Sequence, residues 1–158
     1  MPDSIVKETL QEIEPLSADD LVGAAVRRVT ETGLPALPAV EDDGSFAGIF
    51  GEREFMAALF PGYVKELASS RMISRTMDEA IERRAGCAEE SIRKYLTTDA
   101  VVVEDDFSDT QLAELFLHHR VLIIPIATEG RIHAVVTRND FFRGLAGRFA
   151  QVLDDYGD

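Results

Sequence analysis

The residues of this chain whose types and spacing suit binding chemistry form the tetrapeptide Thr137-Arg138-Asn139-Asp140, where a strand pattern runs into a helix pattern. A helix start presents unpaired backbone N–H groups and a positive dipole end, which together attract anions. A hydroxyl at Thr137 can add a hydrogen bond to a phosphate, and Arg138 can add a charged one. The Asp140 carboxylate can accept two hydrogen bonds from a ribose diol. The apolar residues from Val121 to Ile124 offer a wall for a flat base.

The same tetrapeptide has a second, purely structural interpretation. Thr137-x-x-Asp140 has the form of a capping box, in which both side chains serve only the helix start. On these four residues alone, the cap is the favoured interpretation. The context changes the balance, because an equivalent segment occurs at an equivalent point earlier in the chain.

That equivalence is an internal repeat. Leu37-Pro38-Ala39-Val40, a loop and Gly48 to Phe55 return as Ile124-Pro125-Ile126-Ala127, a loop and Ala134 to Phe141. The offset is 87 residues from Pro38 to Pro125 (125 − 38) and 86 from Glu54 to Asp140 (140 − 54). Two copies of one supersecondary unit are therefore expected, with the cleft between them as the natural ligand site.

Periodicity and turn residues predict the elements of both copies. The first copy reads as a helix that starts at a Ser17–Asp20 cap and stops at Gly33, a strand 36–40, a turn 41–45, a strand 46–50 and a helix 52–60. The second reads as a strand 100–103, a helix 108–119, strands 121–127 and 131–136, and a helix 138–153. Helices over 77–84 and 88–95, broken at Gly86, are expected outside the repeats, because that stretch is too charged to form a core of its own.

Composition limits the classes of function. At 158 residues and 46% apolar content, the chain forms one compact unit or two repeats that share a core. The net charge, 16 minus 29 or −13, opposes binding to nucleic acid or to an anionic membrane. A lone Cys87 cannot form an internal disulfide. The N-terminus has no signal-peptide pattern and the longest apolar run, 121–127, is too short to insert in a membrane, so a cytoplasmic protein is expected.

The sequence contains no recognisable catalytic set. No nucleophile motif, Walker loop or paired-cysteine motif is present, so we predict no catalytic residues. His118 and His119 are adjacent on a predicted helix, and neighbouring helical residues point about 100° apart, which disfavours a shared metal. Neither an enzyme nor a metal site is expected.

The doubled pattern of apolar-Pro-apolar, acidic turn and Gly/Ala-apolar-apolar-Thr-x-x-Asp resembles the tandem CBS domain, named for cystathionine beta-synthase. The segment from Leu59 to Leu67 is similar to linkers in small bacterial proteins of the stand-alone type. The resemblance implies an α/β (α+β) fold of two β-α-β-β-α repeats about a pseudo-twofold axis. The expected divisions are a first repeat 8–60, a helical linker 61–91, a second repeat 92–148 and an acidic C-terminal end 149–158.

The resemblance also implies a ligand and the residues that hold it. CBS pairs bind AMP, ADP, ATP or S-adenosylmethionine, and by analogy Asp140 holds the ribose and Thr137 the phosphate. The segment 98–101 would lie against adenine, with main-chain contacts from 121–123. The complete candidate set is Thr98, Ala100, Val101, Val121, Leu122, Ile123, Pro125, Thr137, Arg138 and Asp140.

The first copy departs from the family pattern. Gly51 stands where the family has Thr or Ser, and Glu54 stands where it has Asp. Gly51 brings no hydroxyl, and Glu54 is longer by one methylene, so the first site is expected to be weak or empty. The residues of this weaker site are Pro35, Leu37, Gly51, Arg53 and Glu54.

The implied role is regulatory. An adenine nucleotide or S-adenosylmethionine would act as a ligand rather than a required cofactor, and would modulate an unknown partner protein. Phe141, Phe142, Phe149, Leu145 and Leu153 give the last helix more apolar surface than one core-facing stripe needs, which favours a homodimer. The alternative is a ligand-free module for structure or protein interaction, which the departures in the first copy favour.

Overall fold

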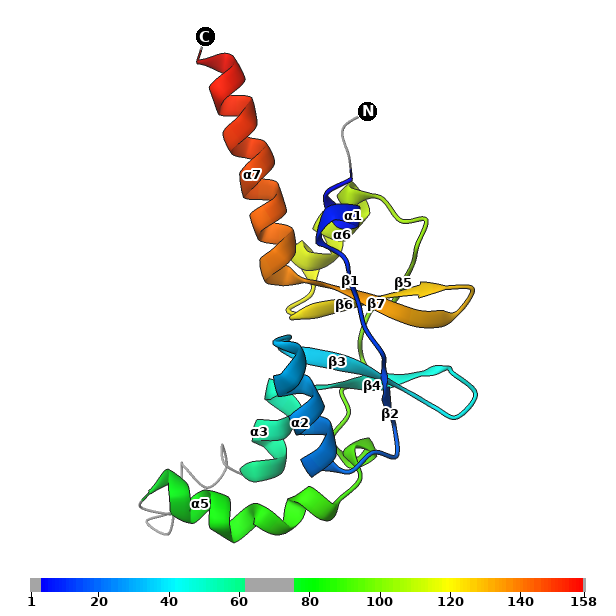
Figure 1. The fold of residues 1–158 in the computed structure, drawn as a ribbon, viewed down its shortest axis with the longest axis vertical. Helices are drawn as coiled ribbons and strands as arrows, with labels where there is room; N and C mark the ends of the chain where they lie inside the picture. Colours follow the sequence, from blue (N-terminus) through cyan, green and yellow to red (C-terminus); the bar gives the residue numbers. More distant parts are fainter. Residues whose placement is uncertain (1–3, 62–75, 158) are drawn as a thin grey trace. The chain divides into compact units, whose positions relative to one another are not determined.

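The structure is a computed structural model that describes residues 4–61 and 76–157 (Figure 1). It contains two compact units, each built of helices and strands. One unit combines the residues up to Pro15 with those from Ala100 onward, and the other spans Leu16–Asp99. The first unit is therefore assembled from both ends of the chain. No described helix is long and apolar enough to span a membrane.

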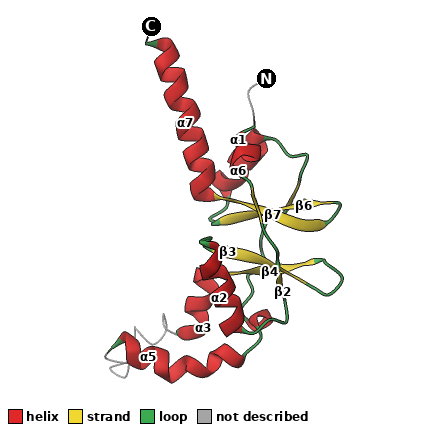
Figure 2. Cartoon of the chain, viewed as in Figure 1, coloured by secondary structure: helices red, strands yellow, loops and turns green. Residues whose placement is uncertain are grey.

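The Leu16–Asp99 unit is a three-stranded sheet with helices (Figure 2). The strand order is β2-β3-β4, with β2 parallel and β4 antiparallel to the central strand. The strands are β2 (Leu16–Ser17), β3 (Ala36–Val40) and β4 (Phe46–Gly51). The helices are α2 (Val22–Thr32), α3 (Glu52–Leu59) and α5 (Met77–Arg84), followed by the 3₁₀ helices η1 (Ala85–Glu89) and η2 (Ile92–Lys94).

The predicted start of α2 is wrong by four residues, because the N-cap is Leu21 rather than Ser17. Ser17 belongs to β2, and the helix begins at Val22 without a side-chain cap. The Ser17 and Asp20 side chains instead close a turn, because the Asp20 carboxylate accepts from the Ser17 N–H at 3.0 Å and the Ser17 hydroxyl from the Asp19 N–H at 3.2 Å. The predicted stop is confirmed, since Gly33 ends α2 with a φ of 73°.

The predicted helix over 88–95 is also wrong. The chain there forms two 3₁₀ turns, because its backbone groups pair with the segment before α2: the Ile92 N–H donates to the Asp20 carbonyl, and the Val22 N–H donates to the Glu90 carbonyl, each at 2.9 Å. Cys87 and Ile92 are buried in the core. The segment thus completes its unit rather than lying outside it. Residues 62–75 of the predicted linker lie outside the described residues.

The unit assembled from both ends of the chain contains a four-stranded sheet in the order β1-β7-β6-β5. The strands are β1 (Gln11–Glu12), β5 (Val103–Glu104), β6 (Ile123–Thr128) and β7 (Arg131–Thr137). The helices are α1 (Ile5–Thr9), α6 (Asp109–His118) and α7 (Arg138–Tyr156). The predicted strand over 100–103 is reduced to the short β5, while the predicted helix 108–119 is confirmed within one residue at each end.

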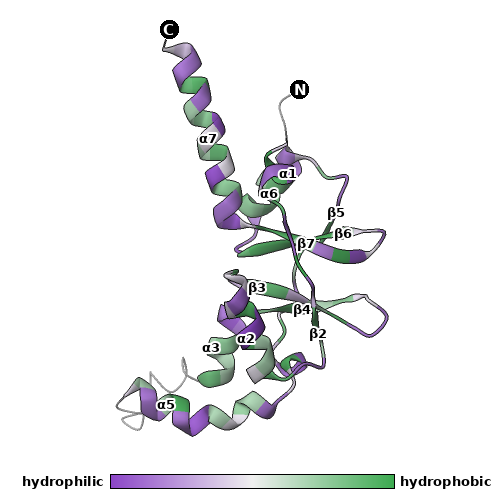
Figure 3. Cartoon of the chain, viewed as in Figure 1, coloured by the Kyte–Doolittle hydropathy of each residue, from purple (hydrophilic) through white to green (hydrophobic). Residues whose placement is uncertain are grey.

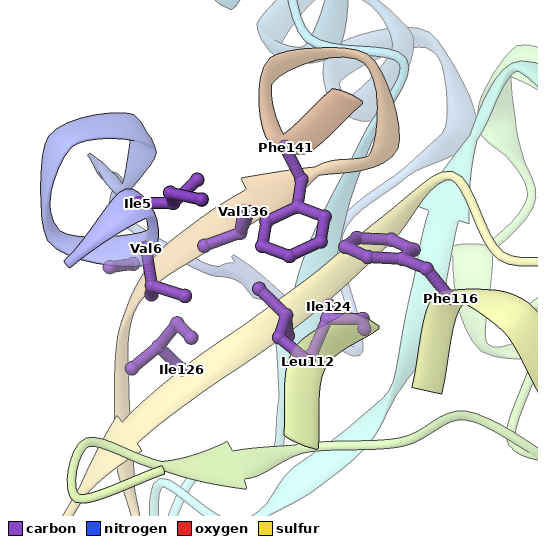
Figure 4. Close-up of a cluster of buried hydrophobic side chains, with 9 residues drawn as sticks. Ile5, Val6, Leu112, Phe116, Ile124, Ile126, Val136 and Phe141 are labelled. Carbon is purple, nitrogen blue, oxygen red and sulfur yellow. The ribbon is translucent and has the colours of Figure 1, made fainter. Parts of the chain in front are cut away.

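Helix α1 joins this unit through apolar contacts and a cap. Ile5 and Val6 enter a buried cluster with residues of α6, β6, β7 and α7 (Figure 4). The Asp109 carboxylate, in the first turn of α6, accepts from the Ser4 hydroxyl at 2.6 Å and from the Ile5 and Val6 N–H groups at 2.9 and 3.0 Å. One carboxylate therefore satisfies the start of a helix that is distant in sequence.

Candidate functional site

The junction of β7 and α7 carries the central candidates. Thr137 is buried at the end of β7 and is the N-cap of α7, where its hydroxyl accepts from the Asp140 N–H at 3.0 Å. This is the first half of a capping box. The second half is absent from the described hydrogen bonds, because the Asp140 carboxylate turns to another partner. The Thr137 hydroxyl therefore caps the helix, as the sequence predicted, whereas the Asp140 carboxylate takes no part in the cap.

The partner of Asp140 is Gln11, whose side-chain amide donates to the Asp140 carboxylate at 2.6 Å. Gln11 lies in β1, which pairs antiparallel with β7, and faces Val135 in the register. The N-terminal segment thus places a side chain on the acid at the start of α7. Sequence reasoning missed Gln11, because nothing in its local pattern links it to a residue 129 positions away.

Arg138 was predicted to pair with a phosphate, but in the structure its side chain is bonded to backbone carbonyls. Its guanidinium donates to the carbonyls of Phe116, His119 and Val121 at 2.7, 2.9 and 3.2 Å. It also lies over the Phe116 ring, 5.8 Å from the centroid. Arg138 therefore joins the end of α6 and the loop after it to the start of α7.

The remaining candidates of this site differ in their placement. Val121 and Leu122 are half-buried in the loop before β6, and the Leu122 carbonyl accepts from the Arg138 N–H at 2.9 Å. Ile123 and Pro125 are buried within β6. Ala100 and Val101 are half-buried in the irregular segment before β5, within the same unit. Thr98 is exposed and belongs to the Leu16–Asp99 unit.

The first copy has the same backbone junction with different side chains. The Glu52 N–H donates to the Pro35 carbonyl at 2.9 Å, as the Arg138 N–H does to that of Leu122. Gly51 caps α3 without a side chain, and a Cβ there would collide with the Pro35 carbonyl oxygen and with Ala36. Leu37 is buried in β3 and Arg53 is exposed on α3. Close backbone packing at Gly51 therefore leaves no room for the threonine or serine of the family pattern.

Glu54 repeats the arrangement of Asp140. It is buried, with 8% of its surface exposed, and its carboxylate accepts from the Thr97 hydroxyl at 2.7 Å. The Thr97 backbone exchanges two hydrogen bonds with Ile49 in β4, at 2.9 and 3.0 Å. This pairing explains Gly48, where a Cβ would lie 2.9 Å from the Thr97 carbonyl oxygen.

The two arrangements obey one symmetry. Gln11 pairs with Val135 and contacts Asp140, whereas Thr97 pairs with Ile49 and contacts Glu54. A shift of 86 residues relates every member of one set to a member of the other (97 − 11, 135 − 49 and 140 − 54). The first residues of each repeat thus supply a polar side chain to the acid of the other repeat. The 86-residue spacing was a signal in the sequence that could have identified both residues.

The groups at this junction are of the types that can bind a ligand. A helix N-terminus, a threonine hydroxyl and a carboxylate are grouped at the start of α7, and they can hold neutral diols or anions. Among residues 4–61 and 76–157, no group of three His, Cys, Asp or Glu side chains could hold a metal ion.

Comparison with known proteins identifies the fold. No curated protein matches the chain. A CBS domain-containing protein from Kribbella flavida is 18% identical, with a TM-score of 0.71, and the alignment covers 91% of this chain and 99% of that one. The structure of CBSX2 in complex with AMP is 16% identical, with coverages of 92% and 98% and a TM-score of 0.64. That of CbpB in complex with c-di-AMP is 10% identical, with coverages of 96% and 90% and a TM-score of 0.61.

The sequence itself matches the family twice. The model of the CBS domain aligns with residues 6–61 and again with residues 92–147, which together make up more than half of the chain. Both matched ranges contain a strand–helix junction with an acid in the first turn of the helix, at Glu54 and at Asp140. The chain belongs to the CBS domain family and carries two such domains in tandem.

Proposed function

We propose that this chain is a regulatory module that binds an adenosine-containing ligand at the start of α7 and thereby modulates a partner protein. The observation that carries the proposal is the grouping of Thr137 and Asp140 at a helix N-terminus. The hydroxyl and backbone N–H groups suit a phosphate, and the carboxylate suits a ribose diol. AMP, ADP, ATP and S-adenosylmethionine all contain the ribose that such a carboxylate recognises.

The same reasoning ranks the two copies. The first copy lacks the hydroxyl at Gly51, and its acid, Glu54, is buried and bonded to Thr97. Asp140 is less buried and its partner, Gln11, is exposed, so a ligand can displace that side chain at lower cost. We therefore expect one principal site, at the second copy.

Structures with the same fold support the choice of ligand class. The related structures include CBSX2 with AMP and CbpB with c-di-AMP, and both ligands contain adenosine units. Modulation then follows if the ligand binds one conformation of the chain more tightly than another. The proposed partners are a cytoplasmic target protein and a second copy of the chain.

A ligand-free interaction module is the second candidate. The observation that favours it is that the acids at the two strand–helix junctions already have hydrogen-bond partners within the chain, Gln11 for Asp140 and Thr97 for Glu54. In that case the two acids stabilise the segments that contain Gln11 and Thr97, and substitution of Asp140 changes stability without changing any binding.

The test is a thermal-shift series with AMP, ADP, ATP, S-adenosylmethionine and c-di-AMP, with GMP as the base control. A ligand at 100 times its Kd adds about 2.7 kcal/mol to the free energy of unfolding. For a chain of this size, that raises Tm by roughly 5–10 °C. We expect a rise with one adenine ligand that Asp140→Asn abolishes.

Asp106→Asn is the matched control, because Asp106 is an exposed acid in a turn of the same unit. It should leave the ligand-induced rise unchanged. An equal rise in wild type and Asp140→Asn would move the site away from α7. No rise with any ligand would leave the interaction module as the function.

A further inference from the structure

The chain passes between the two compact units at two crossings, and the first crossing follows β1 closely. Pro15 is the last residue of the unit that contains α7, and Leu16, at the start of β2, is the first residue of the other unit. Gln11 of β1, which donates to the Asp140 carboxylate, therefore lies four residues before the end of its unit (15 − 11). The carboxylate proposed to hold the ribose is thus bonded to the segment that leads from one unit into the other.

This crossing segment is held firmly on both sides of β1 and weakly in β1 itself. On the N-terminal side, Ile5 and Val6 of α1 are buried, and their N–H groups donate to the Asp109 carboxylate. On the other side, Leu16 is fully buried in β2. The two residues of β1 are polar and exposed, whereas β6 and β7 are largely apolar (Figure 3). Detachment of β1 from β7 therefore uncovers little apolar side chain of β1, and the Gln11 amide is its side-chain bond to α7.

The backbone next to β1 supplies a direct probe of its attachment. The Ile13 N–H donates to the His133 carbonyl of β7 at 2.9 Å, directly after the two paired residues of β1. Backbone hydrogen bonds at an exposed sheet edge open at a lower free energy than those of the core. The exchange rate of the Ile13 amide proton therefore reports how often this edge of the sheet opens.

The second crossing is held differently. Thr97 lies two residues before its unit ends (99 − 97) and exchanges two backbone hydrogen bonds with Ile49. The Thr97 hydroxyl donates to Glu54, which is only 8% exposed, whereas Asp140 is half-buried. A ligand therefore reaches the carboxylate of Asp140 at lower cost than that of Glu54, and the first crossing is the one that a ligand can release.

We propose that a bound ligand displaces Gln11 from Asp140 and thereby detaches β1 from β7, which releases the first crossing between the units. Residues 13–15 alone separate β1 from β2, so a change at β1 is passed on over a short connection. The ligand selects the detached conformation because the two compete for one carboxylate. By linkage, detachment of β1 raises the affinity for the ligand by the same factor. The ligand is that of the proposed function, on which this inference rests.

The first experiment measures amide hydrogen exchange by NMR on the full chain without nucleotide. We expect Gln11→Ala to speed exchange at Ile13 about three- to tenfold, because opening of the edge no longer breaks a bond to a carboxylate. Gln11→Lys, which keeps a donor and adds a positive charge, should exchange no faster than wild type. Unchanged rates in β6 verify that the unit stays folded.

Thr97→Val is the matched control in the other crossing segment. It removes the equivalent hydrogen bond to Glu54, and it should speed exchange at the Ile49 N–H, which donates to the Thr97 carbonyl. Exchange at Ile13 should not change in this variant. Equal acceleration at Ile13 in Thr97→Val and Gln11→Ala would show a general loss of stability and overturn the inference.

The second experiment repeats the exchange measurement with saturating AMP, and chemical shifts of Thr137 and Asp140 report its binding. AMP should speed exchange at Ile13 of wild type by at least as much as Gln11→Ala does, and it should add nothing in Gln11→Ala. Bound AMP with unchanged exchange at Ile13 would overturn the inference and leave the proposed ligand function intact. No AMP-induced shifts, together with faster exchange in Gln11→Ala, would instead reject AMP as the ligand while the role of Gln11 in holding β1 stands.

Discussion

Gln11 and Asp140 share a hydrogen bond of 2.6 Å, and this bond limits how readily the carboxylate can accept a ribose. A ligand must displace the Gln11 amide before it can take both carboxylate oxygens. Hydrogen bonds to charged groups contribute about 1.5–3 kcal/mol net, and less where the donor is exposed as Gln11 is. The Gln11 side chain therefore competes with the ligand for Asp140, and displacing it costs a fraction of this 1.5–3 kcal/mol.

We predict that Gln11→Ala binds the adenine ligand about three- to tenfold more tightly than wild type, since tenfold corresponds to 1.4 kcal/mol. Isothermal titration calorimetry measures the change in Kd. Glu12→Ala is the control, because Glu12 is exposed in the same strand and has Ala134 as its register partner. An unchanged or weaker affinity in Gln11→Ala would show that the glutamine does not compete.

Gly51 shows how packing can remove a site. Because a Cβ at this position would collide with the Pro35 carbonyl oxygen, Gly51→Thr cannot restore the family hydroxyl without moving β3. We predict that the variant loses about 1–3 kcal/mol of unfolding free energy and gains no second ligand site. Urea unfolding and titration stoichiometry check the two parts.

Gly147→Ala is the matched glycine substitution, because a Cβ there has open space and alanine favours a helix by about 1 kcal/mol. It should be neutral or stabilising. A Gly51→Thr variant as stable as wild type, with two bound ligands per chain, would contradict the packing argument.

The residue scale also shows what the sequence could reveal. Thr137 as a helix cap was predictable, because capping depends on residues three positions apart. The carbonyl partners of Arg138 were not, because they belong to the end of α6 and the loop after it, about 20 positions earlier in the chain. The roles of Gln11 and Thr97 could be inferred only from the 86-residue offset between the repeats, because no local pattern links either residue to its acid.

At the scale of elements, Arg138 holds α6 to α7. We predict that Arg138→Ala lowers the free energy of unfolding by about 1–3 kcal/mol, because three backbone carbonyls lose a charged donor. The ligand Kd, measured below the unfolding transition, should change less than threefold. Arg143→Ala, exposed on the same helix, is the control and should change neither quantity. A large loss of affinity with unchanged stability would restore the phosphate role to Arg138.

Asp109 couples α1 to α6 through its charge. Burial raises the pKa of this carboxyl, but hydrogen bonds from the Ser4 hydroxyl and the Val6 and Ile5 N–H groups outweigh burial, so the pKa lies below its ordinary value. A depressed pKa in the folded state stabilises the protein above the unfolded pKa of about 3.9. That stabilisation is lost as the pH falls through the lower folded pKa.

We therefore predict that Asp109→Asn is less stable than wild type by about 1–2 kcal/mol at pH 7, and that the difference shrinks below about pH 4. Urea unfolding at several pH values measures it. Asp106→Asn, in the preceding turn, should show no such convergence with wild type. A difference that stays constant down to pH 2 would exclude the charge of Asp109 as its source.

Elements with strong local signals were predictable, and those shaped by distant partners were not. The α3 and α5 bounds and both hairpins follow from turn residues, glycines and periodicity. The start of α2 and the segment 88–95 deviate because their backbone groups bond to one another across about 70 positions. Helix α1 carries a local cap at Ser4, but its burial depends on residues of the second copy.

At the scale of the whole molecule, the chain is interleaved. Residues 4–15 belong to the unit that holds most of the second repeat, and residues 92–99 belong to the unit that holds most of the first, so neither compact unit coincides with one repeat of the sequence. Each unit also has buried apolar residues of its own. Ile5 packs with α6, β6, β7 and α7, and Ile92 is buried in the unit that contains β3 and β4. Loosening one contact should therefore affect its own unit first.

Ile5→Ala and Ile92→Ala form a reciprocal pair that tests this independence. Each removes a buried isoleucine, with 7% and 0% exposure, and should cost about 2–4 kcal/mol. Hydrogen exchange with mass spectrometry then maps the loss of protection. Ile5→Ala should lower it in β6 and β7 but not in β3 and β4, and Ile92→Ala should do the reverse, because each side chain is buried in a different unit. If both variants lowered protection equally in both sheets, the two units would unfold as one cooperative structure, and a ligand at α7 could then act on the whole chain by stabilising it uniformly rather than by shifting one unit.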